Sequence, residues 1–293
     1  MSRRRAVLVI NDRSRRGNEL AVTVHEQLQA NGIDFVPVSC GKDELLREIA
    51  ACAAGADMVV VGGGDGSMNA VAPALLKCGL PLGILPLGTA NDLARTLGIP
   101  PDVEQAIEII AAGHTKRIDL GHVNGHPFFN VASIGLSVDL ARVLTRDIKR
   151  RFGRLGYALA TLKVLSRARP FRATIVSETE SARVSTLQIA VGNGRYYGGG
   201  NAIDADARID SHELALYSLE FRRAWKLALM ARSFRYGEFG AWEEVRTITS
   251  RAFEIRTRYA RPVNADGEIV TETPAKFTIS PGAVTVFVPQ ESA

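Results

Sequence analysis

Apolar residues in the first 120 positions form short continuous runs, each followed by a stretch with helical character. Runs long enough for buried strands occupy residues 6–10, 33–39, 57–63 and 80–87. Helices are expected at 18–31, 42–54, 68–77, 91–97 and 103–112. Continuous apolar strands that alternate with helices are typical of a parallel sheet covered on both faces. The pattern therefore predicts an N-terminal α/β domain.

Beyond about residue 120, strand-like runs follow one another at short intervals. An Asn124-Gly125 pair between two such runs is a hairpin signal. Further runs occupy residues 172–178, 185–194, 214–220, 246–257, 275–282 and 283–289, and a helical insertion is expected at 153–169. This pattern predicts an antiparallel β-sandwich. We place the domains at 1–121 and 122–293, and the end of the chain could pack back on the first domain.

Composition and net charge exclude few classes of binding partner. The 293 residues carry a net charge of +5 and a pI near 9.3, which indicates an acidic partner such as a nucleotide, a nucleic acid or an anionic lipid. The three cysteines (Cys40, Cys52 and Cys78) lack CxxC spacing and favour a reducing cytoplasm over a zinc site. The apolar run after the basic start is too short for an export signal, and no stretch approaches the roughly 18 residues that span a bilayer.

A glycine-rich loop, Gly62-Gly63-Gly64-Asp65-Gly66-Ser67, follows the third expected strand. Glycine lets backbone N–H groups approach an oxyanion, and a helix N-terminus attracts the same charge. An ordinary strand-to-helix turn is also glycine-rich, so the glycines alone leave both interpretations open. A carboxylate beside a triphosphate, however, requires a divalent cation between them, so Asp65 indicates Mg²⁺. The loop matches neither GxxxxGK[ST] nor GxGxxG.

A second loop, Gly88-Thr89-Ala90-Asn91-Asp92, follows the fourth expected strand. Thr89 and Asn91 can donate to phosphate or ribose oxygens, and Asp92 is a second acid at the same sheet edge. Threonine and asparagine before a helix are also good N-caps, so a capping role is the alternative. Two such loops on adjacent strand ends favour a nucleotide site beyond the carboxyl ends of the strands.

Together these loops resemble the diacylglycerol kinase catalytic-domain family, which includes bacterial lipid kinases and sphingosine and ceramide kinases. The resemblance is carried by GGGDGS and PLGTANDLAR and continues nearly to the end of the chain. It includes residues 11–17 (NDRSRRG), 117–121 (RIDLG), 192–200 (GNGRYYGGG) and 265–268 (ADGE). It implies a nucleotide domain related to phosphofructokinase and NAD kinase, then a β-sandwich, with the active site in the cleft between them.

The resemblance also implies residue roles. Asp65, Asp92 and Asp119 would organise Mg²⁺, Asp266 would be the base on the acceptor hydroxyl, and Glu268 would complete the acidic cluster. ATP would be held by Asn11, Gly62, Gly63, Gly64, Asp65, Gly66, Ser67, Asn69, Gly88, Thr89 and Asn91. The implied activity is ATP- and Mg²⁺-dependent transfer of the γ-phosphate to a lipid hydroxyl. Taken alone, the Asp-Gly pair of ADGE would be read as a hairpin turn.

The chain departs from the family pattern in three places. Ser67 stands where threonine is usual, which keeps the hydroxyl, and Asp12 replaces the usual proline of the N-terminal loop. Ser211-His212 replaces an Asp-Gly pair where some members hold a structural Mg²⁺. Asp206 and Asp210 are the acids that could compensate at that second metal site.

The basic residues in the middle of the chain bear on whether the protein contacts a membrane. Basic residues crowd positions 142–172 and suit an anionic bilayer, although a solvated helix face would look the same. We expect a cytoplasmic protein in peripheral contact with the inner face of the membrane, without nucleic acid. Pairing of two copies at a sheet edge is compatible with this fold. Two alternatives remain for the function. One is a soluble-metabolite kinase of the NAD kinase or phosphofructokinase type, and the other is a non-catalytic regulator that binds a nucleotide or a lipid.

Overall fold

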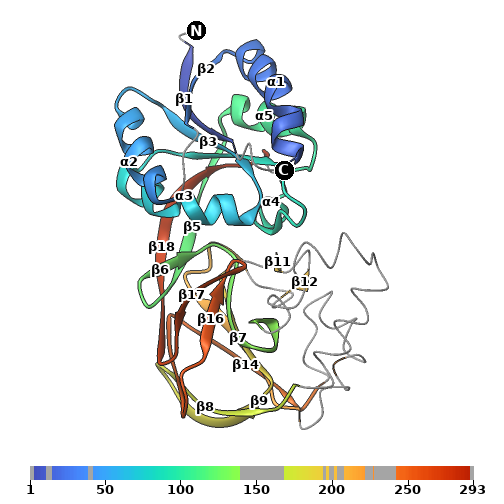
Figure 1. Ribbon diagram of the computed structural model, residues 1–293, viewed down its shortest axis with the longest axis vertical. Coiled ribbons are helices and arrows are strands. Elements are labelled where there is room, and N and C mark those ends of the chain that lie inside the picture. The colour runs from blue at the N-terminus through green and yellow to red at the C-terminus, as the bar shows by residue number, and fades with distance from the viewer. Residues whose placement is uncertain are drawn as a thin grey trace. The chain divides into compact units, whose positions relative to one another are not determined.

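The computed structural model describes residues 3–10, 15–38, 42–138, 168–193, 196–197, 201–202, 208–221, 227 and 242–290 (Figure 1). The chain divides into two compact units. The first contains the described residues up to Leu120 and from Ser280 onward, and the second those between Gly121 and Ile279. The division falls within two strands, β5 (Thr115–Val123) and β18 (Ala275–Phe287).

The first unit is built on a parallel sheet with the strand order β2-β1-β3-β4. The strands are β1 (Arg4–Ile10), β2 (Ile33–Val38), β3 (Met58–Gly63) and β4 (Leu82–Pro86). The end of β18 extends the sheet, with Val286 parallel to Leu82 of β4. The helices are α1 (Arg15–Ala30), α2 (Lys42–Ala53), α3 (Asp65–Cys78), α4 (Asp92–Thr96) and α5 (Val103–Ala112). The predicted α/β class is therefore confirmed.

The core of this unit follows from the continuous apolar runs. Val59, Val60 and Val61 of β3 are all fully buried, so both faces of the strand are covered. In Figure 1, α1 and α5 lie on one side of the sheet and α2 and α3 on the other. The strand order reverses at β1, because β2 lies on one side of it and β3 on the other. Ligands of open α/β sheets bind beyond the strand ends at such a point.

Helix α3 begins at Asp65, three residues before the start that the apolar pattern predicts. Gly64 is its N-cap residue, in extended conformation, and its carbonyl accepts hydrogen bonds from Ser67 N (2.9 Å) and Met68 N (3.2 Å). Apolar periodicity locates only the buried part of a helix, so it misses this polar first turn. Consequently Asp65 lies in the first turn, where a carboxylate interacts favourably with the helix dipole.

The second unit is an antiparallel sandwich, as predicted. One sheet joins β18, β15 (Ala252–Thr257), β8 (Phe171–Ser177) and β9 (Ser181–Thr186) in that order. The other has the order β14-β13-β10-β7-β16-β17. Its strands are β14 (Val245–Ser250), β13 (Leu214–Leu219), β10 (Gln188–Gly192), β7 (Val131–Gly135), β16 (Pro262–Ala265) and β17 (Glu268–Glu272). Strands β6 (His126–Phe128), β11 (Tyr196–Tyr197) and β12 (Asn201–Ala202) are short.

Alternating side chains build the sandwich core. Ile134, Ile189 and Leu216 from one sheet and Ile255 and Phe277 from the other belong to one buried cluster. The predicted hairpin at Asn124-Gly125 is confirmed, with both residues at positive φ between β5 and β6. Residues 275–282 and 283–289, expected as two strands, instead form the single strand β18. Side chains of β5 contact this strand at Gly282, where the two expected runs meet.

Some predicted features lie outside the described residues. These are Asn11, Asp206, most of the helical insertion at 153–169 and most of the basic region at 142–172. Within the described residues, no helix is long and apolar enough to cross a membrane.

Candidate active site

The two glycine-rich loops of the first unit touch through their backbones. A Cβ on Gly88 would lie 2.4 Å from the Gly64 Cα, a distance that real side chains do not reach. Leu87 N and Gly88 N both donate to the Gly63 carbonyl, at 3.0 and 3.2 Å. Only glycine allows this approach, so Gly64 and Gly88 are needed for the packing of the two loops, whether or not a ligand is bound.

Asn91 holds the second loop in shape with its side-chain amide. It lies in the left-handed region, with φ at 50°. Its Oδ1 accepts from Gly88 N at 2.9 Å, and its Nδ2 donates to Pro86 O at 3.2 Å and to Gly88 O at 3.0 Å. The amide group is thus engaged within its own loop, whereas Thr89 is exposed. Donation from Asn91 or Thr89 to a phosphate stays a prediction.

Asp65 connects the two loops by capping the short helix α4. Its Oδ2 accepts from Asp92 N at 3.1 Å and its Oδ1 from Leu93 N at 3.0 Å. Asn91, the N-cap residue of α4, makes no side-chain cap of its own. The carboxylate that begins α3 therefore satisfies the first N–H groups of α4. Asp92 itself is buried at the same place.

Asp119 performs a different task, on β5. It is fully buried, and its Oδ1 accepts from Gly282 N at 2.7 Å. Arg117, on the same strand, donates from Nε to Gly282 O at 2.9 Å. Gly282 has a φ of 54°. Both backbone groups of this left-handed residue are thus satisfied by side chains of β5, which fixes β18 at this position.

The three predicted metal ligands are not gathered into one cluster. Among the described residues, no three His, Cys, Asp or Glu side chains lie together so as to hold a metal ion. Mg²⁺ in nucleotide sites is usually held by one or two carboxylates together with phosphates and waters. Asp65 and Asp92, which are joined by a hydrogen bond, offer oxygen ligands of that kind. They fit a phosphate-held ion better than a site made by protein carboxylates alone.

Asp266, in the second unit, occupies a two-residue hairpin turn between β16 and β17. Asp266 and Gly267 have φ angles of 46° and 96°, as a type I′ turn requires. Asn264 Oδ1 accepts from Gly267 N at 2.9 Å and closes the turn. The hairpin interpretation of ADGE is therefore correct for the backbone. Glu268 is exposed at the start of β17.

The Asp266 carboxylate holds the segment between β6 and β7. Its Oδ2 accepts from Phe129 N at 2.7 Å, and its Oδ1 accepts from Asn130 N and Val131 N, both at 3.0 Å. Its own N–H donates to Val131 O at 3.0 Å. Three charge-assisted hydrogen bonds make this a strong attachment. They fix the position of the carboxylate relative to residues 129–131.

Asn193 of the GNGRYYGGG motif holds the same segment from the end of β10. Its N–H donates to Asn130 O at 2.9 Å, and its Nδ2 donates to Phe129 O at 3.0 Å. Sequence reasoning assigned no role to Phe129 or Asn130. The only sequence signal was their position in the strand-like run that follows the Asn124-Gly125 turn. The two later motifs of the chain are therefore brought together around residues 129–131.

The match to known proteins covers both units. The diacylglycerol kinase catalytic domain matches residues 5–123, and the YegS C-terminal NAD kinase beta sandwich-like domain matches residues 130–288. A Pseudomonas aeruginosa PAO1 protein named "Probable lipid kinase YegS-like" is 31% identical over 100% of this chain and 97% of its own. The chain belongs to the YegS-like lipid kinase family. The family resemblance read from the sequence is thus confirmed.

Other members of the family and solved structures agree. An Enterobacter sp. (strain 638) protein of the same name is 34% identical over 72% of this chain and 73% of its own. A crystal structure of a diacylglycerol kinase from Bacillus anthracis str. Sterne has a TM-score of 0.78 at 20% identity, covering 99% of this chain and 98% of that one. Another from the same organism reaches a TM-score of 0.83 at 23% identity, covering 100% and 98%. These two likenesses show the fold alone.

Proposed function

We propose that this YegS-like lipid kinase family member transfers the γ-phosphate of ATP to the hydroxyl of a lipid, with Mg²⁺. The observation that carries the proposal is the Asp65 cap, because it ties both glycine loops together at the carboxyl ends of the adjacent strands β3 and β4. This edge offers the backbone of two loops, the N-terminus of α3 and two acids to a phosphate-bearing ligand.

In this proposal the residues of the first unit bind and orient the nucleotide. The loops at Gly62–Ser67 and Gly88–Asn91 bind its phosphates, and their mutual backbone contact keeps them rigid. Asp65 and Asp92 would hold Mg²⁺, which supplies positive charge to the phosphate oxygens when it is bound. Asp119 fixes β18 in the same unit through Gly282. The family resemblance implies that its carboxylate would also help to organise Mg²⁺.

The second unit supplies the acceptor side. The acceptor oxygen forms its bond to the γ-phosphorus while the bond from that phosphorus to the ADP oxygen breaks. The acceptor proton passes to a carboxylate of the Asp266-Gly267-Glu268 turn. Asp266 is the residue that the family resemblance implies, and its three N–H donors also make it the residue that positions residues 129–131. Glu268, the first residue of β17, is the exposed carboxylate next to this turn.

Labelled ATP and Mg²⁺, offered with single acceptors, test the proposal. The acceptors are diacylglycerol, phosphatidylglycerol, a sphingoid base, NAD and fructose 6-phosphate. Label in the organic phase with one of the lipids is the expected result. Label on NAD or on the sugar would establish a soluble-metabolite kinase instead, and no transfer to any acceptor would favour a binding regulator.

A pair of glycine variants tests whether the loop contact is needed. Gly88→Ala would force a Cβ against Gly64, and we expect loss of both ATP binding and transfer. Gly55→Ala is the matched control, because Gly55 has a φ of 86° but open space around it. It should strain the same unit without touching the loops, and retain activity. Equal activity in the two variants would contradict the assigned site.

A further inference from the structure

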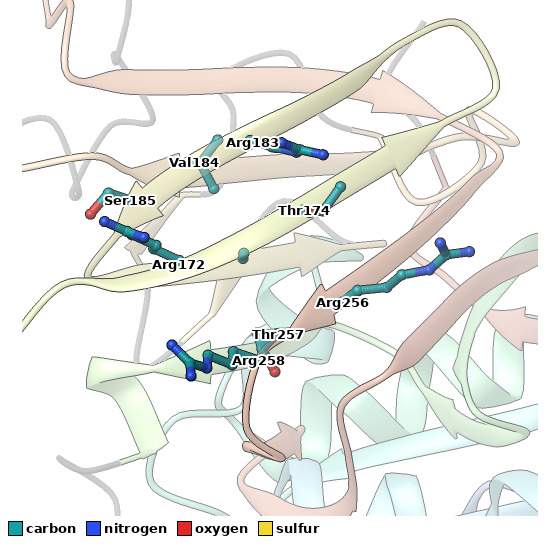
Figure 2. Close-up of a pocket in the computed structure, with 9 residues that line it drawn as sticks. Arg172, Thr174, Arg183, Val184, Ser185, Arg256, Thr257 and Arg258 are labelled. Atoms are coloured by element: carbon teal, nitrogen blue, oxygen red, sulfur yellow. The ribbon is translucent and has the colours of Figure 1, made fainter.

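Four arginines gather on the outer face of the second unit, over strands β8, β9 and β15. They are Arg172, Arg183, Arg256 and Arg258, and we call them the arginine face. With Thr174, Ser185 and their neighbours they line a surface hollow of about 580 Å³ (Figure 2).

Strand alternation places these side chains outside the sandwich. Phe171, Ala173 and Ile175 of β8 point into the core, so Arg172 and Thr174 point outward. The strand register then aligns Arg256, Thr174 and Arg183 side by side across three strands. The basic residues of three strands therefore lie on a single surface rather than being scattered around the unit.

The balance of charge on this surface is strongly positive. Lys276 of β18 faces outward beside Glu254. These strands therefore carry four basic side chains and one carboxylate, and Arg258 directly after β15 adds a fifth basic side chain. Arg256 donates to both oxygens of Glu254 at 2.8 Å. This hydrogen bonding lowers the pKa of Glu254, so the carboxylate stays ionised and neutralises one arginine only. Within the described residues, Arg172, Arg183 and Arg258 have no ion-pair partner.

The arrangement of the arginines suits a plane of charges rather than one small ion. Figure 2 shows that Arg172 and Arg258 point to one side of the hollow and Arg183 and Arg256 to the other, so the guanidinium groups do not converge. Small-ligand sites require convergent polar groups. Tyr259 beside this face is 72% exposed, with the Arg258 guanidinium 5.3 Å from its ring centre. Exposed tyrosine next to basic residues is typical of a membrane interface.

We propose that the arginine face docks this protein on the anionic phospholipid headgroups of a bilayer. The proposal rests on the proposed function in one respect, because a lipid acceptor requires the enzyme to reach a membrane. Each arginine near an anionic surface strengthens binding about fivefold, and the effect is screened by salt. Arg172 is also the last residue of the basic stretch of sequence at 142–172.

Sedimentation with vesicles tests the docking directly. The probes are vesicles of phosphatidylcholine with one quarter phosphatidylglycerol, and vesicles of phosphatidylcholine alone. The Arg172→Gln/Arg183→Gln variant should bind the anionic vesicles roughly 25-fold more weakly than the parent chain. The control variant Arg47→Gln/Lys77→Gln removes the same charge from exposed positions of the first unit and should bind normally. Unchanged binding of the first variant, or equal losses in both, would overturn the proposal.

Two further measurements separate docking from other interpretations. Arg172→Lys/Arg183→Lys should keep vesicle binding, because a plane of headgroups needs charge rather than guanidinium geometry. Loss of binding in that variant would indicate a specific anion site and contradict docking. Tighter binding of the parent chain to duplex DNA than to anionic vesicles at the same salt would also overturn the proposal, in favour of nucleic acid.

Activity with lipid in detergent micelles keeps this proposal distinct from the proposed function. If docking is correct and the function is correct, Arg172→Gln/Arg183→Gln phosphorylates lipid in neutral micelles at the parental rate. If no lipid is phosphorylated by any form while the vesicle result holds, the function fails and the docking stands. If the parent phosphorylates micellar lipid but never binds anionic vesicles, the docking fails alone. Matching melting temperatures establish that the variants are folded.

Discussion

Asp65 caps a helix other than its own: its Oδ1 accepts the Leu93 N–H at 3.0 Å, across 28 positions of sequence. Asp65→Ala should therefore cost about 1 kcal/mol of stability, as loss of a cap usually does. It should also abolish transfer, because the start of α4 loses its side-chain attachment to the first glycine loop. Chemical denaturation and lipid phosphorylation measure the two effects.

Asp102→Ala provides the matched control for that variant. Asp102 caps α5 in the same unit, accepting from Gln105 N at 3.0 Å. It should lose a similar amount of stability while keeping full kinase activity. Comparable activity losses in the two variants would mean that cap loss alone inactivates the unit, and that Asp65 has no special part in the site.

The structural role of Asp119 can be distinguished from a role at the metal by comparison with Arg117. Both side chains bind Gly282, but only Asp119 is an acid. Each of Asp119→Asn and Arg117→Gln should weaken the attachment of β18, at about 1 kcal/mol per hydrogen bond. If Asp119 also acts on the metal complex, only Asp119→Asn should raise the Mg²⁺ concentration needed for half-maximal activity. Titration of activity with Mg²⁺ gives the answer. The same Mg²⁺ dependence in both variants would leave Asp119 with a purely structural role.

A variant of Asp266 should be compared with a variant of Asn193, because both side chains hold residues 129–131 by hydrogen bonds. Asp266→Asn and Asn193→Ala both weaken the attachment of this segment, by about 1–3 kcal/mol. A proton acceptor should lose far more transfer in Asp266→Asn than in Asn193→Ala at equal stability. Similar activities would instead identify Asp266 as a positioning residue. Glu268→Gln, at an exposed position, should leave stability unchanged and completes the series.

His122 predicts how stability changes with pH. Burial lowers the pKa of His122 below its ordinary value of 6.5, against a smaller opposing effect of the hydrogen bond with the Gly125 backbone. The unfolded chain then binds the proton more readily than the folded chain, so stability falls as the pH is lowered through and below 6.5. Urea unfolding at pH 7.5 and pH 5.5 should show a larger acid loss in the parent chain than in His122→Gln. An identical loss in both would contradict this assignment.

The parts of the fold that depend on neighbouring residues could be read from the sequence. The valine run of β3 and the helix α5, whose predicted and observed bounds coincide, are of this kind. The start of α3 was missed because its first turn is polar. The continuity of β18 was missed because Pro281-Gly282 is a local turn signal, whereas the contacts of Gly282 come from Asp119 and Arg117, more than 160 residues earlier in the chain.

The candidate site divides in the same way. Glycines and acids at strand ends indicate a phosphate site by residue type alone, so Gly64, Asp65 and Gly88 could be selected from the sequence. Their partners could not, because the contacts of Asp65 with Leu93 and of Asp266 with Phe129 join distant segments. Residue types can indicate which chemistry a site offers, but only the fold shows that the same carboxylates also hold the backbone.

The path of β18 bears on how this chain folds during its synthesis. The first unit contains residues up to Leu120 and then residues from Ser280 onward, and Val286 completes its sheet beside Leu82. A ribosome therefore makes the whole second unit before it makes the last strand of the first. The first unit should stay incomplete on the ribosome, whereas the sandwich needs only the earlier part of β18. We expect the second unit, which is the middle of the chain, to complete its fold before the first unit, which needs both ends of the chain.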